Sequence, residues 1–287
     1  MTSSSTHYLN ELQSDGYCVI ANAVDASLIE KLNDDLDPAF KNTPFCDGDF
    51  YGRRTKRFGG LLKKSSHCEP LVRHPMVLDL ANAILAPWCD RINLNLTQAV
   101  EIHPGAPTQY PHRDQEMWHG PKGELEYLIN VMWPLSPFRK ENGATRIWPK
   151  SHVDLEITPS RSGDVVIPEL QPGSVLVFLG STLHCGGANR STSIRRGLIV
   201  SYCLGWLKPF ENQWLVYPPE IARTFAPELA ALVGYAQHRP NLGNHEGQCP
   251  SVLLQANPPQ YPAATDALRP EQATALAQFV ANGSHPN

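Results

Sequence analysis

Three residues of the chain have the types and the spacing of a metal site. His112 and Asp114 lie two positions apart in the string Gln109-Tyr110-Pro111-His112-Arg113-Asp114, and on a strand this spacing points both side chains to one face. His184, which follows another apolar run, is the best candidate for a third ligand. Two histidines and one carboxylate on one face of an octahedron leave three positions free, which suits Fe(II) that binds a keto acid and O₂.

An HxD pair also occurs by chance, so the prediction of a metal site needs further support. Two arginines after His184 provide it. Arg195 and Arg196 follow His184 by 11 and 12 positions on the next apolar run. A guanidinium there could clamp the distal carboxylate of a keto acid through two hydrogen bonds. Strand alternation puts Arg195 on one face with Gly197, Ile199 and Ser201, and Arg196 on the other with Leu198, Val200 and Tyr202. The first face has more room, so we predict that Arg195 binds the carboxylate.

Two Gly-containing segments flank the predicted ligands and are expected to be loops. Residues 41–66 contain Tyr51 and Phe58, and residues 115–126 contain Met117 and Trp118. Such loops often cover a pocket, so these four side chains are predicted to contact the substrate.

The pattern along the chain predicts β structure covered by helices. Helical spacing favours helices over Thr6 to Leu12, over Ala26 to Leu36 with Asp25 as the cap, and over Pro75 to Leu85. Short strand-like runs follow, and they lie at Leu94 to His103, Tyr127 to Trp133, Thr145 to Trp148, Ser174 to Leu179 and Ile194 to Trp206. These features predict an antiparallel sandwich or double-sheet jelly roll.

One domain is expected over residues 1–287, with a helical cover (about 1–90), a β core (about 91–210) and a Pro-rich, partly helical tail (about 211–287). The tail, with helical stretches at Pro219 to Val233 and Pro270 to Ala281, is typical of a solvated or dimer-covering appendage.

The composition favours a small-molecule substrate. The formal net charge is -4, from 24 basic and 28 acidic residues that are well mixed, which gives no surface for nucleic acid or an anionic membrane. No apolar run indicates export or a membrane span, so a cytoplasmic protein is expected. The seven cysteines form no CxxC pair and are expected to be reduced.

The chain resembles the phytanoyl-CoA dioxygenase family of Fe(II)/2-oxoglutarate oxygenases, and in particular members that tailor secondary metabolites. The shared pattern runs from Gln109-x-x-His112-x-Asp114 through Glu141-Asn142-Gly143-Ala144-Thr145 to His184 and Arg195. This resemblance implies a double-stranded β-helix of jelly-roll, cupin-like type and non-haem iron on His112, Asp114 and His184. It also implies 2-oxoglutarate on Arg195, with Gln109 and Thr145 as further contacts. Related halogenases replace the acid with a small residue, so Asp114 favours oxygenation, here of a mid-sized and largely apolar natural-product intermediate.

Two other functions are compatible with the same residues. A cupin-type metal protein could bind a metal and catalyse another reaction, which would not depend on a keto acid. A jelly roll without activity could serve as a binding module, and such a module would be expected to lose metal ligands or the arginine clamp.

Overall fold

A computed structural model describes residues 3–158 and 165–283. The strands are β1 (Tyr17–Ile20), β2 (Thr55–Gly59), β3 (Ile92–Ile102), β4 (Leu128–Pro134), β5 (Thr145–Ile147), β6 (Val175–Leu179), β7 (His184–Gly186) and β8 (Arg195–Leu204). The α-helices are α1 (Ser3–Asp15), α2 (Ala26–Asn42), α3 (Glu69–Val72), α4 (Pro75–Leu85), α5 (Gln213–Val216), α6 (Pro219–Ala222), α7 (Pro227–Leu232) and α8 (Pro270–Ala281). Short 3₁₀ helices are η1 (Leu61–Lys63), η2 (Ser66–Cys68), η3 (Ala86–Trp88), η4 (Asp114–Met117) and η5 (Pro250–Leu254).

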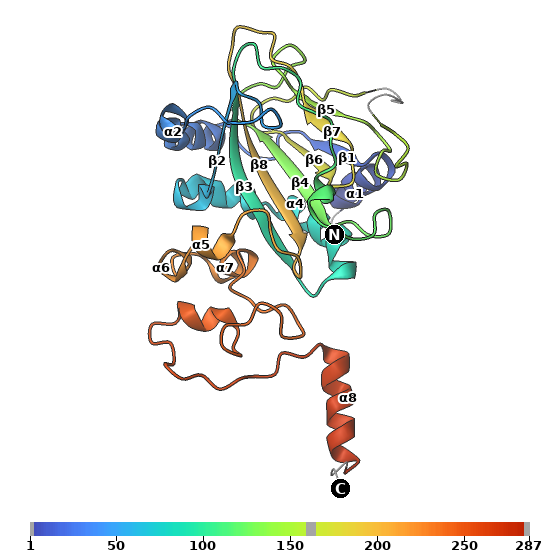
Figure 1. The fold of residues 1–287 in the computed structure, drawn as a ribbon, viewed down its shortest axis with the longest axis vertical. Coiled ribbons are helices and arrows are strands. Elements are labelled where there is room, and N and C mark those ends of the chain that lie inside the picture. The colour runs from blue at the N-terminus through green and yellow to red at the C-terminus, as the bar shows by residue number, and fades with distance from the viewer. Residues whose placement is uncertain (1–2, 159–164, 284–287) are drawn as a thin grey trace.

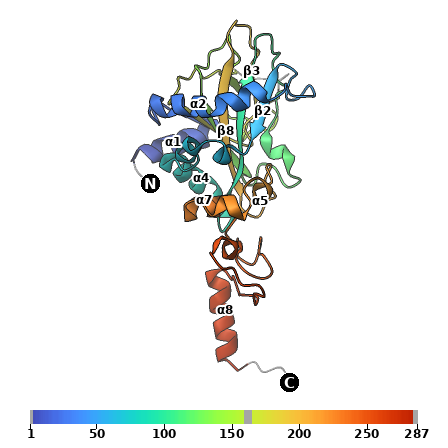
Figure 2. The same cartoon turned by 90° about the vertical axis from the view of Figure 1, so that its left-hand side faces the viewer.

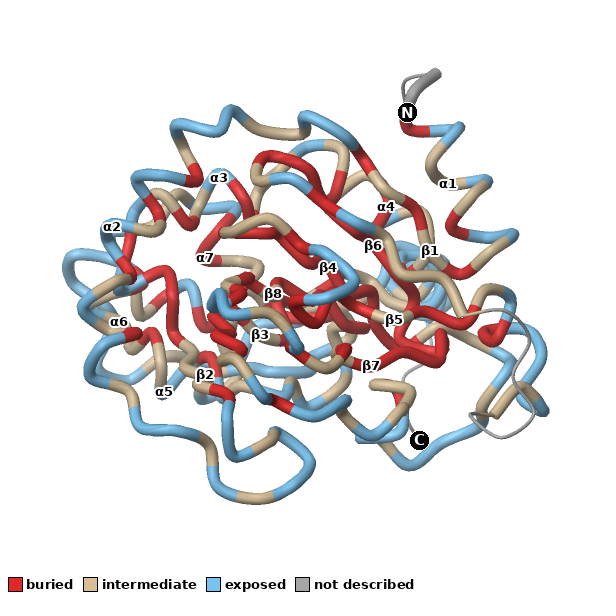
Figure 3. Tube along the Cα trace, turned by 90° about the horizontal axis from the view of Figure 1, so that it is seen from above, coloured by how far each residue is buried: buried red, intermediate tan, exposed pale blue. Residues whose placement is uncertain are grey.

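A six-stranded antiparallel sheet forms the centre of the molecule. Its strand order is β1-β6-β4-β8-β3-β2, and a second, two-stranded sheet pairs β5 with β7. Helices α1, α2 and α4 cover the face of the large sheet that is turned away from the small sheet (Figures 1 and 2). Figure 3 shows that buried residues concentrate along the central strands, between this helical layer and β5 with β7.

The helices pack on the sheet through apolar residues at helical spacing. In α2 the buried residues are Ile29, Leu32, Leu36 and Phe40, which form one stripe. The sequence predicted an end at Leu36, but α2 continues through Pro38 to Asn42. The buried ring of Phe40 provides a reason for the extra turn, because its burial offsets the backbone hydrogen bond that Pro38 cannot make. Asp25 holds the predicted N-cap position, although its side chain makes no capping hydrogen bond.

Three strands were not predicted. Residues 41–66 were expected to be a loop, yet they contain β2, which pairs with the edge of β3. The short strands β1 and β7 pair with β6 and β5. The predicted helix from Pro219 to Val233 is two helices, α6 and α7.

The chain beyond α7 extends away from the sheets. Figure 1 shows η5 below α5 to α7, followed by an extended segment and then α8, which stands clear of the body. In the described part of the chain, no helix is both long and apolar enough to cross a membrane.

Candidate active site

A single antiparallel bridge brings the two predicted histidine ligands together. The amide of His112 donates to the carbonyl of His184 at 3.0 Å, and the amide of His184 donates to the carbonyl of His112 at 3.0 Å. Residues that exchange both hydrogen bonds in this way lie directly opposite each other, with side chains on the same face. The expectation that His112 and Asp114 lie on one strand is therefore wrong, because only this bridge forms before η4 starts at Asp114. Arg113 is extended, which is enough to turn Asp114 to the side of His112.

The three side chains converge on one point. Nε2 of His112 lies 3.3 Å from Oδ1 of Asp114, and Nε2 of His184 lies 3.5 Å from Oδ2. One donor atom from each residue falls within 4.8 Å of the others, and among the described residues this is the group of histidine, cysteine and acidic side chains arranged to hold a metal ion. Such spacing fits a 2-His-1-carboxylate site that binds one ion and leaves positions open.

Neighbouring groups fix how the ligands are presented. Nδ1 of His112 lies 2.8 Å from the carbonyl of Tyr110, and Nδ1 of His184 lies 3.1 Å from the carbonyl of Thr182. A carbonyl requires a proton on Nδ1, so both Nε2 atoms keep a free lone pair for a metal. The amide of Asn130, on β4, donates to Oδ2 of Asp114 at 2.9 Å and orients the carboxylate.

The charge states of the metal-free cluster suit metal binding. Burial lowers the pKa of His184 to about 4, against the attraction of Asp114. Burial would raise the pKa of Asp114, but His184, His112 and Asn130 together hold it at about 2. Burial also opposes the charged form of His112, yet the hydrogen bond and charge of Asp114 raise its pKa above the usual value. An ionised carboxylate beside a neutral His184 is the form that a metal ion binds.

The cluster opens into a cavity of about 110 Å³ between the sheets. Five of the residues predicted to bind cosubstrate or substrate line it: Gln109, Thr145, Arg195, Tyr51 and Met117. Two others do not. The indole of Trp118 stacks on Tyr127 with ring centroids 6.2 Å apart and donates to the carbonyl of Lys208, and the ring of Phe58 packs edge-on against Phe40 in the core.

Arg195 faces this cavity as a buried cation. The residue is only 2% exposed, one nitrogen of its side chain donates to the carbonyl of Gly143, and its Nε has no hydrogen-bond partner in the structure. The guanidinium carbon lies 4.0 Å from the ring centroid of Phe138, which approaches because residue 197 is a glycine whose added Cβ would meet that ring at 2.6 Å. Burial, and the repulsion of Arg57, lower the pKa of Arg195 to about 9.

Several cavity residues were missed by the sequence analysis. Arg57, on β2, is a second guanidinium in the wall, and it donates to Oε1 of Gln98 at 3.0 Å. Phe50 packs its ring 4.9 Å from that of His112, and Phe210 lines the cavity from the segment after β8. If β2 had been predicted, strand alternation would have indicated that Arg57 faces the cavity. No sequence pattern indicated that Phe210 lines it.

Comparison with known proteins identifies the family. The model of the phytanoyl-CoA dioxygenase (PhyH) family matches residues 12–197. The chain belongs to the phytanoyl-CoA dioxygenase family. It is therefore a dioxygenase, an oxidoreductase that acts on small molecules with iron and 2-oxoglutarate, the cofactors of this family.

Fungal dioxygenases are among its relatives in sequence. Dioxygenase aneA of Aspergillus aculeatus is 32% identical over 235 residues, which cover 76% of this chain and 78% of aneA. Dioxygenase trt7 of Aspergillus terreus is 28% identical over 240 residues, which cover 78% of this chain and 82% of trt7.

Solved structures confirm the predicted double-stranded β-helix fold class. The chain is similar to the non-heme alpha ketoglutarate dependent epimerase SnoN from nogalamycin biosynthesis, with a TM-score of 0.59, 17% identity and coverage of 71% of this chain and 84% of SnoN. It is also similar to the carbocyclase SnoK from the same biosynthesis, with a TM-score of 0.55, 16% identity and coverage of 71% and 85%.

Proposed function

We propose that His112, Asp114 and His184 hold Fe(II), and that Arg195 binds the distal carboxylate of 2-oxoglutarate with Gln109 and Thr145 beside it. The donor set supports the metal, because both Nε2 atoms and an ionised carboxylate point to one place. When bound, the iron and the keto acid would supply the oxidising chemistry, with O₂ consumed and succinate and CO₂ released.

The observation that carries this proposal is the unbalanced charge of Arg195. Among residues 3–158 and 165–283, no carboxylate forms an ion pair with it, although the side chain is almost fully buried. A buried charge without a partner is costly. A dicarboxylate that entered the cavity would remove that cost, and it would reach the cluster of His112, Asp114 and His184 in the same space.

We further propose that the substrate is a mid-sized, largely apolar molecule, such as a natural-product intermediate, and that it undergoes hydroxylation or a related C–H oxidation. The cavity wall supports this, because it includes Phe50, Tyr51, Met117 and Phe210. An outer hollow of about 550 Å³ adjoins this cavity, shares Tyr51 and Phe210 with it, and is also lined by Phe58, one of the predicted substrate contacts. The names of SnoN and SnoK describe an epimerase and a carbocyclase, so relatives in fold catalyse different reactions and the product type needs its own assay.

The proposal is tested by succinate release from 2-oxoglutarate under air with added Fe(II). Uncoupled turnover should occur without the substrate, and His184→Ala should abolish it together with Fe(II) binding, because the change removes a metal ligand. His119→Ala, at an exposed histidine outside the cluster, is the matched control and should behave as wild type.

A spectroscopic measurement separates the metal site from the keto-acid site. Anaerobic addition of 2-oxoglutarate to the Fe(II) protein should give a weak visible charge-transfer band. Full succinate release and stoichiometric Fe(II) in His184→Ala would refute the metal assignment. Absence of the band with iron bound would instead refute keto-acid binding.

A further inference from the structure

Helix α8 exposes an apolar stripe to solvent. None of its 12 residues is buried, and the helix stands clear of the body in two perpendicular views (Figures 1 and 2). Ala273, Leu276, Ala277 and Val280 recur at intervals of three and four positions and form an apolar stripe, in which Leu276 is 43% and Val280 is 69% exposed. A helix of this length is marginal in water and is stabilised mainly by packing of its apolar face.

A groove on the body offers a surface of matching character. It has a volume of about 270 Å³ and lies between the chain after β8 and the chain around α7. Its walls include Trp206, Trp214 and Leu242, which are 42%, 46% and 48% exposed, and we call it the tryptophan groove. Solvent-facing aromatic residues gathered at one place mark an interaction surface.

The tryptophans present their apolar faces to this groove. The indole nitrogen of Trp206 donates to the carbonyl of Trp88 at 3.1 Å, and that of Trp214 donates to the carbonyl of Gly234 at 3.1 Å. Because the polar edges of both rings are bonded within the body, the exposed surface that the two indoles offer to an occupant of the groove is apolar. The groove shares no lining residue with the cavity at His112.

We infer that α8 of a second copy of this chain lies in the tryptophan groove, and that the two copies exchange these helices reciprocally. The stripe and the groove belong to one chain, so a twofold axis would cover both surfaces on both copies and close the assembly. The charge of α8 fits this occupant: from Pro270 to Ala281 the helix carries Glu271 and neither lysine nor arginine. A helix for anionic lipid or nucleic acid would carry basic residues.

The area of contact is sufficient for a dimer. A 12-residue helix is about 18 Å long and about 10 Å wide, so packing half of its circumference buries about 280 Å². The groove would bury a similar area, and two reciprocal contacts would then bury about 1,100 Å² in total. This value exceeds the roughly 1,000 Å² that a specific interface requires.

The test uses two charged variants of the full chain and light scattering after gel filtration. Leu276→Glu places a charge on the stripe, and Leu242→Lys places the opposite charge in the groove. Wild type should be a dimer at micromolar concentration, and each variant alone should dimerise roughly a hundredfold more weakly or worse, because each homodimer would contain two unpaired charges in apolar surroundings. Gln278→Glu, on the opposite face of α8, is the matched control and should remain dimeric.

An equimolar mixture of the two variants decides the geometry. The mixed dimer contains one wild-type contact and one contact in which the carboxylate introduced by Leu276→Glu meets the ammonium introduced by Leu242→Lys, so dimers should reappear on mixing. Val280→Glu, used in place of Leu276→Glu, should also weaken the homodimer and restore dimers when it is mixed with Leu242→Lys. A monomeric wild type, variants that stay dimeric, or a mixture that stays monomeric would each overturn the inference, and the last outcome would mean that α8 packs elsewhere.

Discussion

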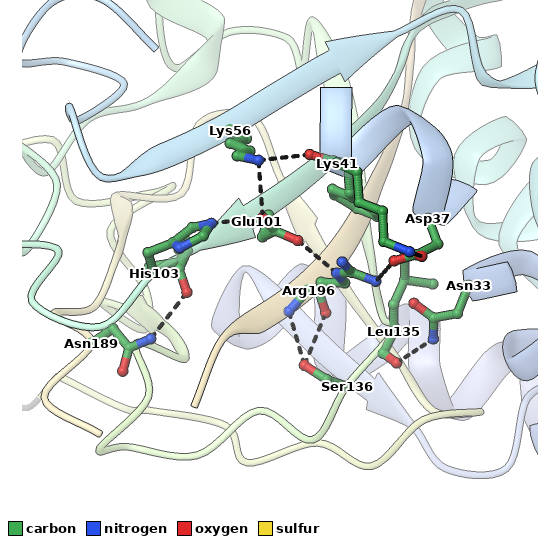
Figure 4. Close-up of polar contacts among 12 residues, drawn as sticks. Asn33, Asp37, Lys41, Lys56, Glu101, His103, Leu135, Ser136, Asn189 and Arg196 are labelled. Atoms are coloured by element: carbon green, nitrogen blue, oxygen red, sulfur yellow. Dashed lines mark hydrogen bonds and ion pairs between the residues drawn. The ribbon is translucent and has the colours of Figure 1, made fainter. Parts of the chain in front are cut away.

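Adjacent residues of β8 lie in two regions of opposite character. Arg196 points toward α2, where its Nε donates to Oε2 of Glu101 at 2.7 Å and its Nη1 lies 3.1 Å from Oδ1 of Asp37 (Figure 4). Arg195 points toward the cavity, and in the described part of the chain it has no carboxylate partner. The same side-chain type is thus neutralised on one face of the sheet and left unbalanced on the other.

This difference between the two arginines indicates different roles: Arg196 stabilises the fold, and Arg195 is available to bind a ligand. On the outer face, Glu101 is 2% exposed and also contacts His103 at 2.6 Å, so the fold itself completes this network (Figure 4). On the inner face, the carbonyl of Gly143 and the ring of Phe138 contact Arg195, but no carboxylate of the described chain offsets its desolvation, which lowers its pKa. A cation kept in this state is expected to contribute to ligand binding and to reduce stability.

The largest expected effect is on the 2-oxoglutarate requirement. Arg195→Leu should raise the concentration needed for half-maximal succinate release by at least about tenfold, because loss of one partner of a buried charged pair costs about 2 to 5 kcal/mol. Arg196→Leu should change it only slightly. Titration of 2-oxoglutarate against both variants checks the comparison, and a larger loss in Arg196→Leu would reverse the roles assigned to the two faces.

The second expected effect is on the free energy of unfolding. Here Arg196→Leu should have the larger effect, and Arg195→Leu the smaller. Arg196→Leu should lower the free energy of unfolding by about 2 kcal/mol, because buried Glu101 would keep His103 and Lys56 but lose the guanidinium that pairs with its Oε2. Arg195→Leu should leave that free energy unchanged or higher, since it removes an unbalanced buried charge. Urea unfolding of the metal-free variants measures both, and equal losses would remove the distinction between the faces.

Strand alternation predicted this orientation of the two arginines from sequence, because β8 is long and regular. The register of β8 with β3 agrees, since Glu101 lies opposite Arg196 and Ile102 lies opposite Arg195. The fold class and the family were also predicted correctly, the first with help from apolar runs that follow local periodicity and the second from the resemblance carried by the motif residues.

The sequence analysis failed at segments whose local structure depends on tertiary contacts. β2 is an edge strand that forms on β3, and its sequence Thr55–Gly59 contains two basic residues, so it has no apolar alternation to detect. The segment before Asp114 contains a single bridge because its partner, β7, is only three residues long. Phe210 reaches the cavity only through the path of the chain after β8, which no short-range pattern records.

The third expected effect concerns a half-buried carboxyl group, and it appears only above about pH 4.5. Burial raises the pKa of Glu126 from 4.5 to about 7, although Ser181 donates hydrogen bonds to it through its hydroxyl and its amide. Between these two values the folded state binds more protons than the unfolded state, so this group makes stability fall as the pH rises from about 4.5 to about 7. Glu126 therefore resembles Arg195 in being a charge that the fold disfavours.

Glu126→Gln should remove this pH dependence, because an amide stays neutral and its oxygen can still accept from the amide of Ser181. The variant should be more stable than wild type by on the order of 2 kcal/mol at pH 8 and nearly equal to it at pH 4.5. Glu116→Gln, at an exposed position of the same segment, should show no such trend. Urea unfolding across this pH range tests the prediction. A gain that is the same at every pH would assign the effect to packing, and the resemblance between Glu126 and Arg195 would then fail.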